Sequence, residues 1–104
     1  MKALIKPQSC ENIQEIRDAI DTIDQGILQL FVERLEYVKE IVKFKRPDEE
    51  GIIARDRKEE VLKLRKEWAK EGGLDPKLIE DIFRLVIDKN IEIQLEINNS
   101  KIHN

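Results

Sequence analysis

A heptad seam in the N-terminal part of the chain is the feature that most constrains its fold. Apolar side chains recur three or four residues apart, which is the a/d pattern of a helix that buries one stripe. The ten seam positions are Ile13, Ile16, Ile20, Ile23, Ile27, Leu30, Arg34, Tyr37, Ile41 and Phe44. Nine of the ten are apolar or aromatic, and only Arg34 is charged. The pattern predicts one long helix.

Signals at both ends place this helix at about residues 12–45. Asn12 is a favourable N-cap residue, and Glu15 follows three residues later as its capping-box partner. Pro47 stops the helix near Lys45, and we expect residues 46–52 to form a mobile loop.

Two further helices are predicted at about residues 54–70 and 75–97, and no strands. Gly72 and Gly73 end the second helix, and Asp75 caps the third. The polar run Asn98-Asn99-Ser100 is expected to end the third helix. The chain is therefore predicted to be all-α with three helices.

The length of the first helix predicts the assembly. A helix of about 34 residues is roughly 50 Å long. A compact domain of this size has a radius of gyration of only about 13 Å, so two shorter helices cannot cover such a rod. We expect residues 1–104 to form a single domain whose seam is buried against a second copy, in an intertwined helical homodimer.

Composition excludes several classes of protein. The net charge of −3 argues against nucleic-acid and anionic-membrane partners. Cys10 is the only cysteine and His103 the only histidine, which excludes a Cys/His metal site or catalytic pair and fits a reducing cytoplasm. No run approaches the roughly 20 apolar residues of a membrane span, and residues 1–10 lack a signal-peptide core.

Charged residues interrupt the apolar faces, and Arg34 is the clearest case. The pattern alone leaves open whether Arg34 sets helix register, pairs with a glutamate or binds an anion. Lys45 lies eleven residues later, about 16 Å along the axis, and could bracket a small dianion with Arg34. Arg17 lies seventeen residues before Arg34, about 25 Å away, so only the Arg17 of an antiparallel partner could approach it.

Two other groups of polar residues are candidates for the same site. Asn90 and Gln94 are amides four residues apart on an apolar stripe, where they either bond to helix ends or point into a cavity between helices. Arg55 and Arg57 stand where cations oppose the helix dipole, whereas Asp56 favours it, although all three also fit a solvated first turn. A cationic pocket with amides suits binding and electrostatic stabilisation rather than covalent catalysis.

Taken together, these residues resemble the all-helical chorismate mutases. The matching positions are Ile16, Arg17, Ile20, Asp21, Ile23, Asp24, Leu30, Arg34, Val38, Lys45, Arg55, Asp56, Leu74, Asp75, Ile82, Phe83 and Gln94. The resemblance covers roughly residues 10–97. It implies an intertwined dimer with two active sites, each using one arginine of the partner, and a reaction from chorismate to prephenate that needs no cofactor.

The resemblance also implies roles for single residues. Arg34 and the partner's Arg17 would bind the two carboxylates of chorismate. Lys45 and Gln94 would hydrogen-bond the ether oxygen, where negative charge develops as the C–O bond breaks.

The remaining positions match the family less closely. Asp56 stands at a family glutamate and would bind the ring hydroxyl, and Arg55 matches an arginine close to the site. Asn90 stands where a serine is common, and Ile52 where some mutases place an aspartate.

The isochorismate pyruvate lyases of salicylate biosynthesis are a related alternative. Residues that resemble that branch are Cys10, Tyr37, Val38, Lys39, Phe44, Lys45, Trp68, Ala69, Gly73, Leu74 and Asp75. The Arg55-Asp56 pair favours the mutase. A non-catalytic helical dimerisation module is a third, weaker interpretation.

Replacing Arg34 distinguishes the hypothesis that the chain is an enzyme from the hypothesis that it is only a dimerisation module. Arg34→Leu should raise the melting temperature of the dimer in either case, because a buried cation is costly. If the chain is an enzyme, a dicarboxylate ligand raises the melting temperature of the wild type and not that of the variant. If it is only a module, no dicarboxylate shifts either melting temperature.

Overall fold

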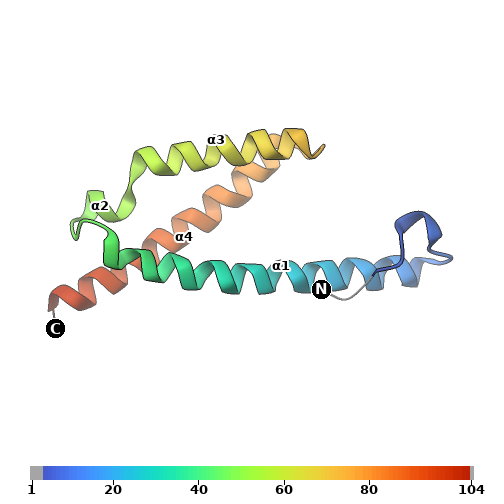
Figure 1. Cartoon of the computed structure of the whole chain (residues 1–104), viewed down its shortest axis with the longest axis horizontal. Helices are drawn as coiled ribbons and strands as arrows, with labels where there is room; N and C mark the ends of the chain where they lie inside the picture. The colour runs from blue at the N-terminus through green and yellow to red at the C-terminus, as the bar shows by residue number, and fades with distance from the viewer. Residues whose placement is uncertain (1–3, 104) are drawn as a thin grey trace. The chain divides into compact units, whose positions relative to one another are not determined.

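The computed structural model describes residues 4–103, with side chains for residues 4–101, and the described chain contains helices and turns but no strand (Figure 1). In chain order the elements are η1 (Pro7–Ser9), α1 (Ile13–Glu40), η2 (Ile41–Phe44), α2 (Glu49–Ile53), α3 (Arg55–Glu71) and α4 (Pro76–His103). Three of these helices are long, which confirms the predicted all-α class. None of the helices within residues 4–103 has the length and apolarity to cross a membrane.

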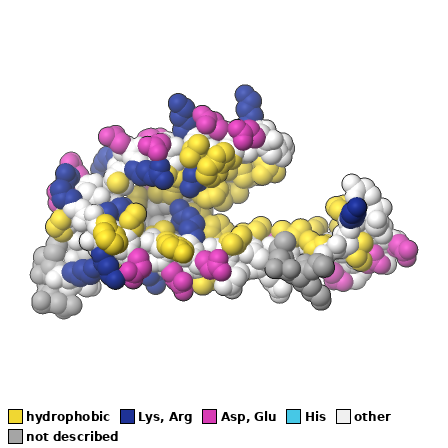
Figure 2. Space-filling view, in the orientation of Figure 1, with side chains coloured by type: hydrophobic (Ala, Val, Ile, Leu, Met, Phe, Trp, Pro, Cys, Tyr) yellow, Lys and Arg dark blue, Asp and Glu magenta, His cyan; other side chains and the backbone are white. Residues whose placement is uncertain are grey.

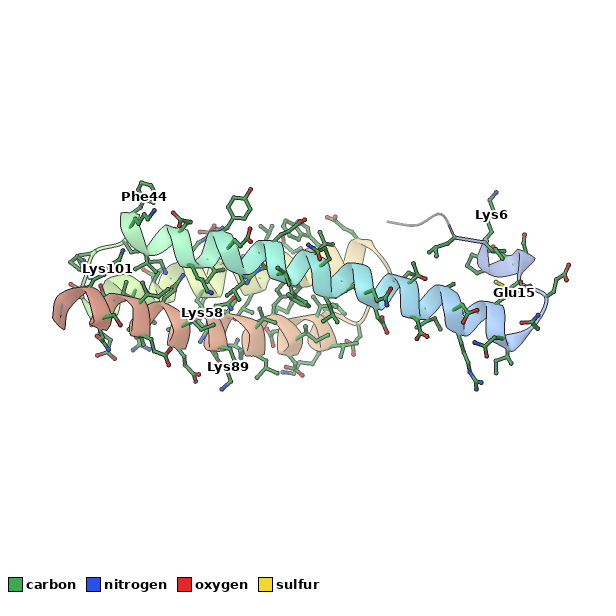
Figure 3. All side chains as sticks on the ribbon, turned by 90° about the horizontal axis from the view of Figure 1, so that it is seen from below. Lys6, Glu15, Phe44, Lys58, Lys89 and Lys101 are labelled. Carbon is green, nitrogen blue, oxygen red and sulfur yellow. The ribbon has the colours of Figure 1, made fainter. Side chains whose placement is uncertain are left out.

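The first predicted helix is present, with its last turn wound more tightly than expected. Asn12 Oδ1 accepts a hydrogen bond from the Glu15 backbone N–H at 2.9 Å, as an N-cap should. The α-helix changes to a 3₁₀ turn at Ile41, and Lys45 has an extended backbone with φ −86° and ψ 150°. Lys45 therefore follows the helix rather than ending it. Phe44, the last seam position, is 85% exposed and projects outward (Figure 3).

The prediction of a loop over residues 46–52 was wrong in part, because α2 occupies its second half. Asp48 caps this helix, and its Oδ1 accepts a hydrogen bond from the Gly51 backbone N–H at 2.7 Å. A Cβ atom on Gly51 would lie 2.4 Å from the Arg46 carbonyl oxygen, so only glycine allows this close approach. A five-residue helix containing a glycine has no apolar period long enough to predict it.

Helices α3 and α4 are joined by a tight turn and pack against each other (Figure 1). Gly73 has φ 78°, and the Leu74 N–H donates to the Ala69 carbonyl at 2.8 Å, which closes the end of α3 as predicted. The end of the third helix was predicted wrongly, because α4 continues through Asn98 to His103. Asn98 is buried in the helix instead of ending it.

The chain divides into two compact units, Met1–Glu36 and Tyr37–Asn104. Buried apolar side chains of the second unit form its core, and they are Val42, Ile52, Val61, Leu62 and Ala69. In the first unit the apolar seam residues are exposed, with Ile13 63% exposed and Leu30 64% exposed. Figure 2 shows apolar side chains at the surface along α1.

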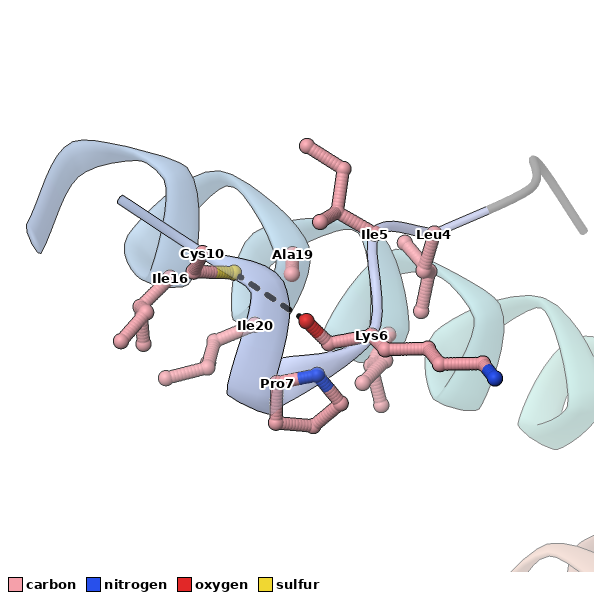
Figure 4. Close-up of a pocket in the computed structure, with 9 residues that line it drawn as sticks. Leu4, Ile5, Lys6, Pro7, Cys10, Ile16, Ala19 and Ile20 are labelled. Atoms are coloured by element: carbon pink, nitrogen blue, oxygen red, sulfur yellow. Dashed lines mark hydrogen bonds between the residues drawn. The ribbon is translucent and has the colours of Figure 1, made fainter. Parts of the chain in front are cut away.

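The N-terminal segment of the first unit folds back on the start of α1. Residues Leu4–Cys10 and the first turns of α1 enclose an apolar cavity of about 320 Å³ (Figure 4). The thiol of Cys10 donates a weak hydrogen bond to the Lys6 carbonyl over 3.7 Å. Three seam residues, Ile16, Ile20 and Ile23, line this cavity.

Substitution of Gly51 tests the packing of α2. Gly51→Ala should lower the free energy of unfolding by about 1–3 kcal/mol, because the new methyl group meets backbone that cannot give way. Gly72→Ala is the matched control, since its Cβ would lie 3.4 Å from the nearest atom. The control should change stability by less than about 0.5 kcal/mol. Equal effects in urea unfolding at one protein concentration would contradict the account of α2.

Candidate active site

Lys45 and Gln94, which are far apart in sequence, make a direct contact. The Lys45 Nζ donates hydrogen bonds to Gln94 Oε1 at 2.9 Å and to the Ile52 carbonyl at 2.6 Å. Gln94 lies on α4 and is only 5% exposed, and Lys45 is partly buried. The ammonium therefore bridges α2 and α4.

The amide of Gln94 is held in one orientation. Its Nε2 donates to the Val38 carbonyl at 2.8 Å, near the end of α1. An ammonium only donates hydrogen bonds and a carbonyl only accepts them, so turning the amide over would break both contacts. Gln94 thus joins the end of α1, the lysine after η2 and helix α4 in one network.

The charge of Lys45 faces neutral acceptors in this network. Both of its partners are neutral carbonyl oxygens, and burial lowers the pKa of the Lys45 ammonium from its ordinary value of 10.5. These two bonds use two of the three N–H groups of an ammonium. A partly buried cation with neutral partners favours the approach of an anionic or polar oxygen ligand.

Asn98 was missed as a site residue in the sequence. It is 7% exposed, and its Nδ2 donates to the Pro47 carbonyl at 3.1 Å. The available signal was its spacing, because Asn90, Gln94 and Asn98 are each one helical turn apart. The partly buried Asn90 lies one turn before Gln94 on α4.

Arg55 and Asp56 lie in the first turn of α3. Together with Arg46, Glu50, Ala54 and Arg57, they line an open pocket of about 500 Å³ at the start of α3. Neither Lys45 nor Gln94 belongs to this lining, so the structure does not place the two groups in one pocket. Ala54, between α2 and α3, has φ 49°, a left-handed conformation that costs a non-glycine residue about 1 kcal/mol.

Arg17 and Arg34 both lie on α1 in the first unit. The Arg17 side chain is exposed. Arg34 is partly buried, and this burial lowers the pKa of its guanidinium.

The chain matches a known protein family over most of its length. Residues 16–95 match the family model of chorismate mutase type II. The chain belongs to the type II chorismate mutase family. The matched range includes every candidate site residue from Arg17 to Gln94, so the family resemblance inferred from the sequence is confirmed.

The relatives of this chain include an isochorismate pyruvate lyase and two T-proteins. The chain is 38% identical over 90 residues to an isochorismate pyruvate lyase of Pseudomonas aeruginosa, covering 86% of this chain and 88% of that protein. It is 35% identical over 74 residues to the T-protein of Haemophilus influenzae, covering 71% of this chain. The T-protein of Enterobacter agglomerans is 36% identical over 72 residues, covering 69% of this chain. The chain spans only 20% and 19% of the two T-proteins.

The contact between Lys45 and Gln94 predicts how Lys45 titrates. In the wild type, the Lys45 ammonium should lose its proton below its ordinary pKa of 10.5, because burial penalises the charged form. In Gln94→Glu a carboxylate faces the ammonium, which favours the charged form and raises the pKa. NMR of the lysine ε-methylene group against pH measures both values. An unchanged pKa in Gln94→Glu would show that the two side chains are not in contact.

Proposed function

We propose that this chain is a chorismate mutase that rearranges chorismate to prephenate. The observation that carries the proposal is the hydrogen bond between Lys45 Nζ and Gln94 Oε1, which holds a partly buried ammonium at a defined position. Membership of the type II family supplies the reaction class. Residues 1–104 act in this proposal as one mutase-like domain.

The reaction makes demands that this inventory of residues meets. A pericyclic rearrangement needs no nucleophile, because one C–O bond breaks as one C–C bond forms within the same molecule. The enzyme must hold a flexible dicarboxylate in a reactive shape and stabilise negative charge on the ether oxygen. Lys45 donates to that oxygen, and the second N–H of the Gln94 amide donates beside it.

The substrate carboxylates need further cations. In the proposal, Arg34 binds one carboxylate and the partner's Arg17 binds the other. Asp56 accepts a hydrogen bond from the ring hydroxyl, and Arg55 and Asn90 lie at the edge of the substrate. Arginine suits this task because its planar guanidinium binds carboxylates through two parallel hydrogen bonds.

The exposed seam of α1 supports a homodimer. Helix α1 has no buried residue among its 28, although apolar side chains recur along one face. Large apolar patches on a protein surface usually mark an interface. Apolar side chains are also exposed on α3 and α4, where Trp68 is 52% exposed and Leu85 is 65% exposed. We propose that a second copy covers both surfaces.

Isochorismate pyruvate lyase is the second candidate function. The observation that favours it is the match to the Pseudomonas lyase, which covers nearly the full length of both proteins. Isochorismate carries the same two carboxylates and a corresponding ether oxygen, so the same cations would serve both reactions. The lyase releases pyruvate, whereas the mutase retains all atoms of its substrate.

Two assays on the purified protein separate these functions. Loss of the chorismate ultraviolet absorbance, with prephenate formed, measures the mutase, and coupled detection of pyruvate from isochorismate measures the lyase. Lys45→Ala should lower kcat by about 10²–10³-fold, because it removes a preorganised donor to the developing charge. Lys43→Ala is the matched control, since Lys43 is an exposed lysine paired with Glu40 at 2.6 Å.

The two assays distinguish the mutase from the lyase. Prephenate formation that depends on Lys45 and not on Lys43 supports the mutase. Release of pyruvate from isochorismate without prephenate formation replaces the mutase by the lyase. Activity on neither substrate would overturn the proposal for this site.

A further inference from the structure

We propose that Asn98 is a positioning residue, which holds the backbone after Lys45 and so keeps the Lys45 ammonium beside Gln94. The inference rests on the proposed function for its catalytic consequence. Asn98 does not reach the ligand in this proposal, because its amide is bonded to the protein backbone. Its effect passes through the segment that carries Lys45.

The first step in the argument is the burial of Asn98. A side-chain amide that is only 7% exposed is expensive to bury unless its polar atoms are bonded. Its Nδ2 donates to the Pro47 carbonyl at 3.1 Å. Pro47 has no N–H of its own and lies between two helical elements, so this side chain supplies a bond that regular structure does not.

The second step is the spacing of the two buried amides on α4. Gln94 and Asn98 are one turn apart, so both project from one face of the helix. Gln94 holds the Val38 carbonyl and the Lys45 ammonium, and Asn98 holds the Pro47 carbonyl. Helix α4 therefore fixes the connection from α1 to α2 on both sides of Lys45.

The third step is that Lys45 lies outside the helices, so helical hydrogen bonds do not fix its backbone. Its backbone is extended, and its N–H is bonded to the carbonyl of Val42, a residue of η2. Beyond it, Asp48 and Gly51 form the start of α2, whose Ile52 carbonyl accepts from the ammonium. If the Pro47 carbonyl is released, the Lys45 backbone and the Ile52 acceptor can both shift relative to Gln94.

The experiment compares Asn98→Ala with Asn99→Ala. Asn99 is the adjacent residue on α4 and is exposed, so its replacement controls for the change in side chain. We expect Asn98→Ala to lower kcat about 10-fold, because small displacements of a catalytic group have large effects. KM should change little, since the carboxylate-binding arginines are untouched. Asn99→Ala should leave kcat unchanged.

Two further measurements separate positioning from simple loss of stability. In Asn98→Ala, the Lys45 pKa measured by NMR should rise toward the ordinary lysine value, because the ammonium regains water. Val61→Ala removes a buried side chain from α3 and lowers stability, and Val61 makes none of the hydrogen bonds of the network. At a temperature well below both melting points, it should leave the Lys45 pKa and kcat unchanged.

A Lys45 pKa that is the same in Asn98→Ala and in the wild type would overturn the proposal, whatever the activity of the protein. If the wild type acts on neither chorismate nor isochorismate, the proposed function fails, while the pKa comparison still decides the role of Asn98. Equal losses of kcat in Asn98→Ala and Val61→Ala would also reject a positioning role.

Discussion

The candidate site depends on the two hydrogen bonds that the side-chain amide of Gln94 makes. Gln94 is almost completely buried, and its amide accepts from the Lys45 ammonium while donating to the Val38 carbonyl. A hydrogen bond to a charged group contributes about 1.5–3 kcal/mol when both partners are present. Removing this amide would leave the Lys45 ammonium bonded to the Ile52 carbonyl and would break the bond to the Val38 carbonyl. Gln94 therefore contributes both to the site and to local stability.

The surrounding structure explains how a lysine comes to point inward. The change from α-helix to 3₁₀ turn at Ile41 ends the first helix just before Lys45, which then leaves in an extended conformation. The cap at Asp48 and the close approach at Gly51 turn the chain back at once, and this brings the Ile52 carbonyl to the ammonium. The Ile52 carbonyl and the Gln94 side-chain amide accept hydrogen bonds from Lys45 without neutralising its charge, which is therefore available to an anion.

Sequence patterns predicted the long helices well because each has a strong signal. The seam from Ile13 to Phe44 predicted the first helix, and Gly73 predicted the turn after the second. The pairing of Lys45 with Gln94 in one site followed from the family resemblance, and helix α4 does bring these two side chains together. The approach of Arg34 and the partner's Arg17 to that pair remains a prediction.

Other features could not be predicted because they depend on tertiary contacts. Helix α2 is too short for an apolar period, and it depends on the capping of Asp48 and the space at Gly51. Asn98 looked like a helix terminator because asparagine has low helix propensity. Its amide instead bonds to Pro47, a residue 51 positions earlier, and no local pattern reports such a contact.

The central proposal is that each active site combines the Lys45–Gln94 pair and Arg34 of one chain with Arg17 of another. The most direct test is to co-express Arg17→Ala and Arg34→Ala chains and to assay the mixed dimers on chorismate. Each variant alone should be nearly inactive. The mixture should regain about a quarter of wild-type activity, because half of the dimers are mixed and each of these has one intact site. A mixture no more active than either variant alone would contradict a site shared between two chains.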